Sequence, residues 1–173
     1  MQRLLIIDDN AAALHAYSDL LAVREPAIEV TTATSAEAAL ESMDTTVFDV
    51  VVCDYRLPGL DGLGFARACR EAGRDPSVVL VTGYGSIELE EEAAQQGVYA
   101  VLHKPVDPQT FLSVVRRAFL RKWLRRFPGS GFALEPERRY SLGSSLVCGT
   151  SGNHGTGARE PLSRAMPPHP RKG

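Results

Sequence analysis

The stretch Leu4–Asp9 (LLIIDD) is a short apolar run that ends in two aspartates. Three later stretches have the same form, with a polar residue after an apolar run: Val50–Asp54 (VVVCD), Val78–Thr82 (VVLVT) and Ala100–Lys104 (AVLHK). Runs of this length and composition are typical of strands buried on both faces of a parallel sheet. The carboxyl ends of such strands meet at one edge, where ligands bind. We therefore predict that three carboxylates, one hydroxyl and one ammonium share a pocket.

Strand and helix patterns alternate along the first part of the chain. The predicted strands are Leu4–Ile7, Ile28–Ala33, Val47–Cys53, Val78–Val81 and Val98–His103. The predicted helices are residues 11–23 after the cap Asn10, the segment that starts from a capping-box pattern at Thr34–Glu37, Leu63–Glu71, the segment from Ser86 to Gln96, and the segment from Asp107 to just before Pro128. Five strand–helix units imply right-handed crossovers and a covered parallel sheet. The predicted fold class is therefore α/β, a doubly wound five-stranded (βα)5 sheet.

The acidic residues at this edge of the sheet indicate a divalent cation. Asp8 and Asp9 follow the first strand, and Asp54 ends a neighbouring one, so their negative charges come close together. Mg²⁺ relieves such repulsion, prefers oxygen ligands and keeps positions that a phosphoryl oxygen can fill. Taken alone, an aspartate pair after a strand is more commonly a turn or a helix cap than a metal site.

The remaining polar groups suit phosphoryl transfer. A carboxylate can attack phosphorus and form an acyl phosphate, and we assign that role to Asp54. The added negative charge is offset by the Lys104 ammonium, and the Thr82 hydroxyl can donate to a phosphoryl oxygen. Phosphoryl transfer depends mainly on positioning and charge stabilisation. Singly, these residues would usually be turn formers or a solvated lysine, but their joint placement at strand ends favours the functional interpretation.

These stretches resemble the receiver domains of two-component response regulators, the CheY-like family, from Arg3 to about Arg121. The motifs that carry the resemblance are LIIDDN at residues 5–10, VVCDYRLPGLDG at 51–62, VLVTGYGS at 79–86 and LHKP at 102–105. The resemblance implies a flavodoxin-like sheet with strand order 2-1-3-4-5. It also implies that Asp54 is the phosphoacceptor for a histidine kinase or a histidine phosphotransfer protein. Mg²⁺ would be bound directly by Asp9, Asp54 and the backbone carbonyl of Arg56, and through water by Asp8.

Two further residues match the family, and one position departs from it. Thr82 resembles the switch hydroxyl, and Lys104 resembles the phosphate-contacting lysine, whose bond to Pro105 is expected to be cis. Family members usually carry an aromatic residue three positions before this lysine, where this chain has Val101. Tyr99 would point to the same face of a regular strand. We hypothesise that phosphorylation still occurs here but that the output surface formed by the fourth helix, the fifth strand and the fifth helix responds differently. The alternative is that Tyr99 replaces the aromatic residue.

The charge is divided unevenly along the chain. Residues 1–115 carry 18 Asp/Glu and 7 Lys/Arg, a net charge of −11, whereas residues 116–173 carry 3 and 12, a net charge of +9. We predict a receiver domain over residues 1–125. Residues 126–173 form a basic tail, rich in Gly, Ser and Pro, that we predict to be disordered and without a recognisable effector domain. The chain could also be a receiver fragment of a larger or DNA-binding regulator whose output uses this segment. Without a DNA-reading motif, we favour a solvated basic face over nucleic-acid binding.

Other function classes are disfavoured. No run of about 18 apolar residues and no signal-peptide pattern is present, and three scattered cysteines suit a reducing, cytoplasmic setting. Phosphohydrolases that use aspartate typically need a second aspartate two residues after the nucleophile, where this chain has Arg56. We therefore expect a signalling switch and not an enzyme, either a monomer or a phosphorylation-dependent dimer.

Overall fold

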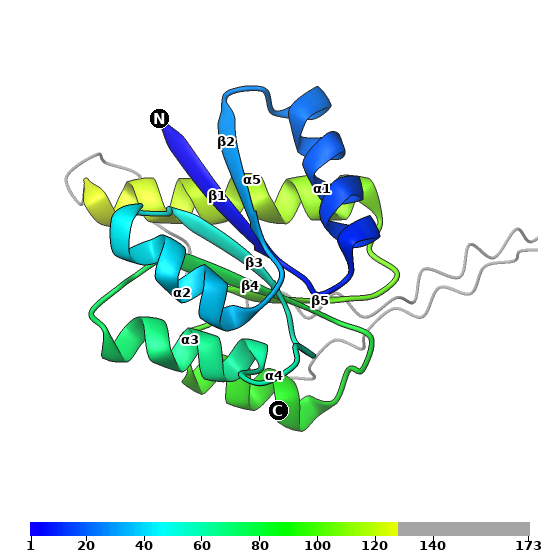
Figure 1. Ribbon diagram of the computed structural model, residues 1–173, viewed down its shortest axis with the longest axis vertical. Coiled ribbons are helices and arrows are strands. Elements are labelled where there is room, and N and C mark those ends of the chain that lie inside the picture. Colours follow the sequence, from blue (N-terminus) through cyan, green and yellow to red (C-terminus); the bar gives the residue numbers. More distant parts are fainter. Residues whose placement is uncertain (128–173) are drawn as a thin grey trace, which may run out of the picture.

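The computed structural model describes residues 1–127. These residues form a five-stranded parallel sheet in the order β2-β1-β3-β4-β5, which confirms the predicted fold class and strand order (Figure 1). The strands are β1 (Gln2–Ile7), β2 (Ile28–Ala33), β3 (Val50–Asp54), β4 (Ser77–Thr82) and β5 (Ala100–His103). The helices are α1 (Ala11–Arg24), α2 (Ala36–Thr45), α3 (Gly62–Glu71), α4 (Ile87–Gln95) and α5 (Pro108–Arg126). The predicted tail from residue 128 onward lies outside the described residues, and α5 extends one residue past the predicted boundary at 125.

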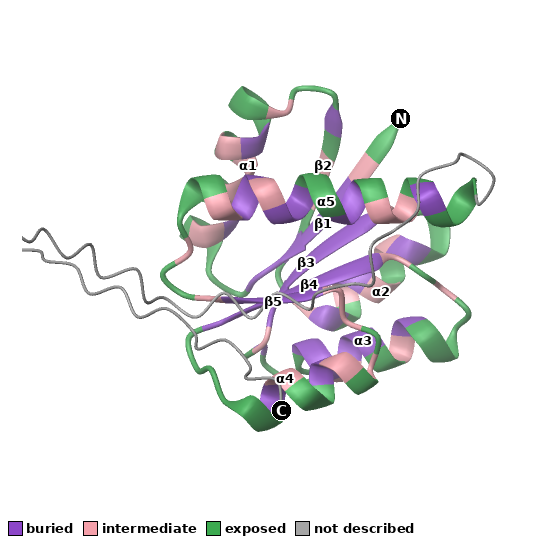
Figure 2. Cartoon of the chain, turned by 180° about the vertical axis from the view of Figure 1, so that it is seen from behind, coloured by how far each residue is buried: buried purple, intermediate pink, exposed green. Residues whose placement is uncertain are grey.

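The helices form a layer on each face of the sheet, with α1 and α5 on one face and α2, α3 and α4 on the other (Figure 1). Each strand supplies both layers because successive side chains point to opposite faces. In β1, Leu4 and Ile6 pack toward Phe111 of α5, whereas Leu5 and Ile7 pack toward Phe65 of α3. All six are essentially inaccessible to solvent. Burying one such side chain contributes about 1.5–3 kcal/mol. Figure 2 shows β1, β3, β4 and β5 as buried along most of their length, whereas the edge strand β2 is mostly intermediate or exposed.

Side-chain caps start all five helices. Asn10, Ser86 and Asp107 cap α1, α4 and α5 as predicted, and each side-chain oxygen accepts a hydrogen bond from an amide in the first turn. The same arrangement at Asp61 starts α3. A cap of this kind contributes about 1 kcal/mol to the stability of its helix. The ends of α3 and α4 are followed by Gly73 and Gly97, whose φ angles of 68° and 74° are accessible to glycine at little cost.

The capping-box prediction for α2 is wrong in its register. Ser35, and not Thr34, is the N-cap, and its hydroxyl accepts a hydrogen bond from the Ala38 amide. The Glu37 carboxylate accepts a hydrogen bond from the Leu60 amide at 3.1 Å instead of closing the box. This long-range bond ties α2 to the loop between β3 and α3, and a local pattern could not have indicated it.

Two strands begin later than predicted. Val47 is 77% exposed, because the chain reaches its partner strand only at Val50, which pairs with Leu4 of β1. Likewise, β5 begins at Ala100, because the Val98 amide still donates to the Ala93 carbonyl at the end of α4.

One backbone prediction made from the resemblance is confirmed. The Lys104–Pro105 peptide bond, directly after β5, is cis. Over residues 1–127, none of the helices combines the length and the apolar character that crossing a bilayer requires.

Candidate functional site

The three predicted acidic residues meet at the carboxyl edge of the sheet. Asp8 follows β1, Asp54 is the last residue of the neighbouring β3, and Asp9 lies beside Asp8 on the exposed side. One carboxylate oxygen from each of them lies within 4.8 Å of the others. Asp8 is only 2% exposed and Asp54 is 8% exposed. Two buried carboxylates and one exposed carboxylate therefore form a cluster at this edge of the sheet.

Asp8 is held by its own turn as well as by the pocket. Its Oδ1 atom accepts a hydrogen bond from the Asn10 amide at 2.9 Å, which helps to start α1, and its Oδ2 atom accepts one from Nζ of Lys104 at 3.2 Å. One oxygen of Asp8 therefore forms the turn that the sequence suggested, and the other contacts Lys104.

Lys104 brings a positive charge into the acidic pocket from the end of β5. Its Nζ atom lies 2.8 Å from Oδ1 of Asp54 and 3.2 Å from Oδ2 of Asp8. Burial acts to lower the pKa of the Lys104 ammonium, but its hydrogen bonds to the Asp54 and Asp8 carboxylates and the attraction of their negative charges together outweigh burial and hold that pKa above its ordinary value. The ammonium therefore stays charged throughout the physiological range and partly neutralises the carboxylates.

Thr82 lies at the end of β4, between the strands that carry Asp54 and Lys104, and it is almost fully buried. Its hydroxyl donates to the Tyr84 carbonyl at 2.9 Å and accepts from the Tyr84 amide at 3.0 Å. The hydroxyl is therefore engaged with the loop between β4 and α4. The Thr82 carbonyl also accepts a hydrogen bond from the Lys104 amide at 2.7 Å, which joins the two strand ends.

Two loops that flank this edge of the sheet make a contact that the sequence did not indicate. The Arg56 guanidinium lies over the ring of Tyr84, with 3.8 Å between Cζ and the ring centroid. Arg56 comes two residues after Asp54, and Tyr84 comes two residues after Thr82. The spacing of each residue from its strand end could have suggested that both lie near the pocket, but their mutual contact depends on loop conformation.

The backbone around Asp54 is closely packed. A Cβ atom added at Gly62, the first residue of α3, would lie 2.8 Å from the Asp54 carbonyl oxygen and 3.1 Å from Cα of Tyr55. Only glycine allows α3 to begin this close to the end of β3. The neighbouring thiol of Cys53 is buried, and burial raises its pKa well above the ordinary value, so it stays protonated and is a poor nucleophile. Asp54 is thus held in place beside an inert thiol.

The donor set fits a hard divalent cation. Carboxylate oxygens are the ligands that Mg²⁺ prefers, and Mg²⁺ sites in proteins typically use one or two carboxylates together with water. Asp9 and Asp54 offer such oxygens within 4.8 Å of each other and of Asp8. Asp9 and Asp54, with Asp8 behind them, are the side chains that could hold Mg²⁺.

The prediction that Tyr99 shares a face with Val101 is wrong. Val101 belongs to the same core cluster as Leu89 and Ala93 of α4, whereas Tyr99 packs against the cluster on the side of α5. The Arg121 guanidinium lies 5.2 Å from the centroid of the Tyr99 ring. Tyr99 precedes β5, where alternation does not hold, and it therefore faces away from α4.

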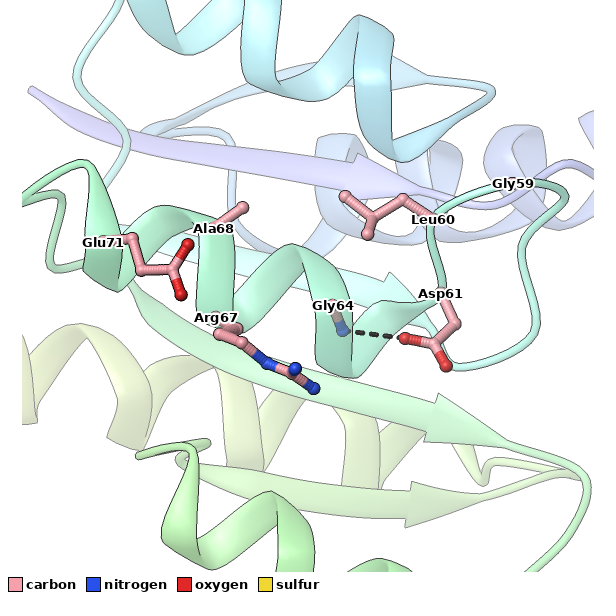
Figure 3. A pocket seen from close by; sticks show the side chains of 7 residues that line it. All are labelled: Gly59, Leu60, Asp61, Gly64, Arg67, Ala68 and Glu71. Atoms are coloured by element: carbon pink, nitrogen blue, oxygen red, sulfur yellow. Dashed lines mark hydrogen bonds between the residues drawn. The ribbon is translucent and has the colours of Figure 1, made fainter.

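A second depression lies away from the acidic cluster. It has a volume of about 420 Å³ and runs along the outer side of α3, lined by Gly59, Leu60, Asp61, Gly64, Arg67, Ala68 and Glu71 (Figure 3). One of its carboxylates, Asp61, accepts a hydrogen bond from the Gly64 amide at 2.7 Å as the cap of α3. None of the residues that line it belongs to the acidic cluster.

Several basic residues of α5 pair with carboxylates of the same domain. Arg116 contacts Glu25, and both Lys122 and Arg125 contact Asp75. These ion pairs offset part of the positive charge of α5, which reduces the charge that is available to a nucleic acid.

Comparisons with known proteins agree with this geometry. Residues 4–116 match the family described as the response regulator receiver domain. The chain is 33% identical over 144 residues to response regulator protein FleR of Pseudomonas aeruginosa, and the alignment covers 81% of this chain and 29% of that protein. It is also 31% identical over 167 residues to protein-glutamate methylesterase/protein-glutamine glutaminase 5 of Myxococcus xanthus, and that alignment covers 96% of this chain and 40% of that protein. The chain thus spans less than half the length of these two relatives.

Solved structures are similar over the same region. The crystal structure of a response regulator receiver domain protein from Clostridium thermocellum superposes with a TM-score of 0.66 at 28% identity, over 72% of this chain and 99% of that one. The similarity therefore extends over essentially the whole of that protein.

Proposed function

The chain belongs to the response regulator receiver domain family, and we propose that it is a switch that accepts a phosphoryl group on Asp54. Receiver domains of this family serve phosphorylation-dependent signalling and are not enzymes in general. The proposed donor is a histidine kinase or a histidine phosphotransfer protein. The observation that carries the proposal is the placement of the Asp54 carboxylate 2.8 Å from the Lys104 ammonium, within a cluster of three acidic side chains.

The proposed step is a displacement at phosphorus. A carboxylate oxygen of Asp54 attacks the phosphorus of the donor's phosphohistidine, a bond forms between that oxygen and phosphorus, and the bond between phosphorus and the imidazole nitrogen breaks. The electron pair of the broken bond stays on the imidazole. The step needs no proton from Asp54, which reacts as a carboxylate.

Lys104 and Thr82 hold the product. The ammonium that contacts Asp54 and Asp8 can move its hydrogen bonds to the phosphoryl oxygens and offset their charge. The Thr82 hydroxyl, close to this edge of the sheet, can donate to another phosphoryl oxygen once it releases the Tyr84 carbonyl. Asp9 and Asp54, with the Arg56 carbonyl and with Asp8 acting through water, would hold Mg²⁺, which offsets charge on the transferred group when it is bound.

The free thiols suit a cytoplasmic protein, which we propose as its location. Cys53 and Cys69 are both buried and unpaired with each other, as is usual in a reducing compartment. A second candidate function is that of a receiver domain within a longer regulator, whose output would include DNA binding through the basic segment. This candidate rests on the greater length of the relatives.

Stoichiometry distinguishes a switch from an enzyme. The full chain is incubated with acetyl phosphate and Mg²⁺, and both bound phosphoryl groups and released inorganic phosphate are measured. A switch reaches one acyl phosphate per chain and then hydrolyses it slowly. Rapid release of many phosphates per chain would show an enzyme and would contradict the proposal.

A further inference from the structure

His103 connects the pocket to α4. It is the last residue of β5, paired with Thr82 of β4 and followed directly by Lys104. Its side chain is 17% exposed, and its Nε2 atom lies 3.2 Å from Oε1 of Glu90 in α4. Because an ionised carboxylate can only accept, Nε2 carries the proton in this bond. One imidazole therefore joins the end of β5 to a helix on the surface.

The same ring packs against the loop between β4 and α4. A Cβ atom added at Gly85 would overlap Cε1 of His103 and lie 2.6 Å from its Nδ1 atom. The absence of a side chain at Gly85 is what lets the loop lie on the imidazole. A change in this loop would therefore press on the His103 ring or release it.

The loop is itself fixed by the hydroxyl at the pocket. Thr82 uses its single O–H proton to donate to the Tyr84 carbonyl. If that proton is given to a phosphoryl oxygen, it cannot also hold Tyr84, because a hydroxyl has one donor. The loop then loses a contact that keeps Gly85 against His103.

We propose that His103 transmits occupancy of Asp54 to α4, through its ring contact with Gly85 and its hydrogen bond to Glu90. The inference rests on the proposed function, since it requires a phosphoryl group at Asp54. It goes beyond that function by assigning the link to the helix to an imidazole next to Lys104. His103 is a positioning residue here, because it acts through the loop and the helix and not on phosphorus.

Hydrogen exchange of α4 tests the link in the full chain. Beryllofluoride with Mg²⁺ serves as the probe, since it binds a carboxylate oxygen as a tetrahedral analogue of the phosphoryl group. In wild type, beryllofluoride should change the exchange rates of Ile87–Gln95 by roughly fivefold or more, as expected of a coupling between sites. In His103→Ala and in Glu90→Ala the change should be less than about twofold, while beryllofluoride still binds.

Matched variants separate coupling from simple loss of structure. Glu91→Ala removes an exposed carboxylate next to Glu90 and should keep the full response. Gly85→Ala alone should weaken the exchange response of α4, because the added methyl group displaces the His103 ring. In the double variant Gly85→Ala/His103→Ala the response should be no smaller than in His103→Ala, because the ring is already absent.

Failure of the proposed function and failure of this inference give different results. No beryllofluoride binding to wild type would overturn the proposed function and this inference with it. Binding with an α4 response that is as large in His103→Ala and Glu90→Ala as in wild type would overturn the inference alone.

Discussion

The Nζ atom of Lys104 lies 2.8 Å from Oδ1 of Asp54, across the end of the intervening strand β4. The same ammonium also contacts Asp8 at 3.2 Å. One positive charge therefore serves two buried carboxylates, and in the proposed product it would serve the phosphoryl group instead. The ion pair is thus part of the site's chemistry and also part of the stability of the domain.

Removing Lys104 should destabilise the protein and leave labelling possible. In Lys104→Met, Asp8 and Asp54 lose their shared counter-charge, and we expect the free energy of unfolding to fall by about 1–2 kcal/mol. This is below the cost of breaking a fully buried pair, because Lys104 is partly exposed and water screens its charge. Urea denaturation measures the change. Lys122→Met, which removes an ion pair on the surface, should change the stability by less than about 0.5 kcal/mol.

The stability gap between wild type and Lys104→Met should depend on pH in one direction. The pKa of Lys104 is raised in the folded protein above its ordinary value of 10.5. Its contribution to stability is therefore complete below pH 10.5, and it is lost as pH rises through the higher pKa of the folded state. Denaturation at about pH 8 and about pH 11 checks this. A gap that widened with increasing pH would contradict the assignment.

Mg²⁺ should stabilise the wild-type protein. A ligand that binds only the folded state adds RT ln(1 + [L]/Kd), about 1.4 kcal/mol when its concentration is ten times Kd. Thermal unfolding with and without MgCl2 measures the effect. Asp9→Ala removes an exposed carboxylate of the cluster and should abolish most of the shift, whereas Asp19→Ala, an exposed aspartate of α1, should keep it. An equal shift in both variants would indicate nonspecific salt effects.

The contact between Arg56 and Tyr84 should lengthen the life of the acyl phosphate. The two side chains come from the loops that follow Asp54 and Thr82, where they can limit the approach of water to phosphorus. An exposed cation–π contact contributes about 0.5–1 kcal/mol, so Tyr84→Ala should speed hydrolysis roughly two- to fivefold. Phosphate release after removal of acetyl phosphate gives the rate. Tyr84→Phe keeps the ring face and should match wild type; a rate equal to that of Tyr84→Ala would instead implicate the Tyr84 hydroxyl.

Gly62 should be intolerant of a side chain. Its Cβ would lie 2.8 Å from the Asp54 carbonyl oxygen, a backbone atom that cannot move freely. Gly62→Ala should therefore lower the free energy of unfolding by about 1–3 kcal/mol and slow labelling of Asp54. Gly83→Ala, where a Cβ meets nothing within 4 Å, is the stability control. Equal stability of the two variants would show that α3 can shift away from β3 at little cost.

The sequence predicted most of the sheet because its pattern is local. Leu5 and Ile7 alternate with Leu4 and Ile6, and Asp8 follows at the end of the strand. Once the order and direction of the strands are known, the position of Asp8 at the carboxyl edge of the sheet follows. The joint placement of Asp8, Asp9, Asp54 and Lys104 depends on these same features.

The features that sequence missed depend on contacts between distant segments. Tyr99 faces α5 because the end of α4 uses the Val98 amide and delays the start of β5. Glu37 leaves its expected cap to bind the Leu60 amide, and His103 meets Glu90 only because β5 lies beside the loop that leads into α4. No local periodicity encodes these three contacts.

The most direct test of the central claim is the incorporation of radiolabelled acetyl phosphate into wild type, Asp54→Asn and Asp61→Asn in the presence of Mg²⁺. Asp61→Asn is the matched control, because asparagine caps a helix about as well as aspartate and Asp61 caps α3. We expect one phosphoryl group per chain in wild type and in Asp61→Asn, labile in both acid and alkali as an acyl phosphate is, and none in Asp54→Asn. Labelling of Asp54→Asn at the wild-type level would contradict the assignment of Asp54 as the phosphoacceptor.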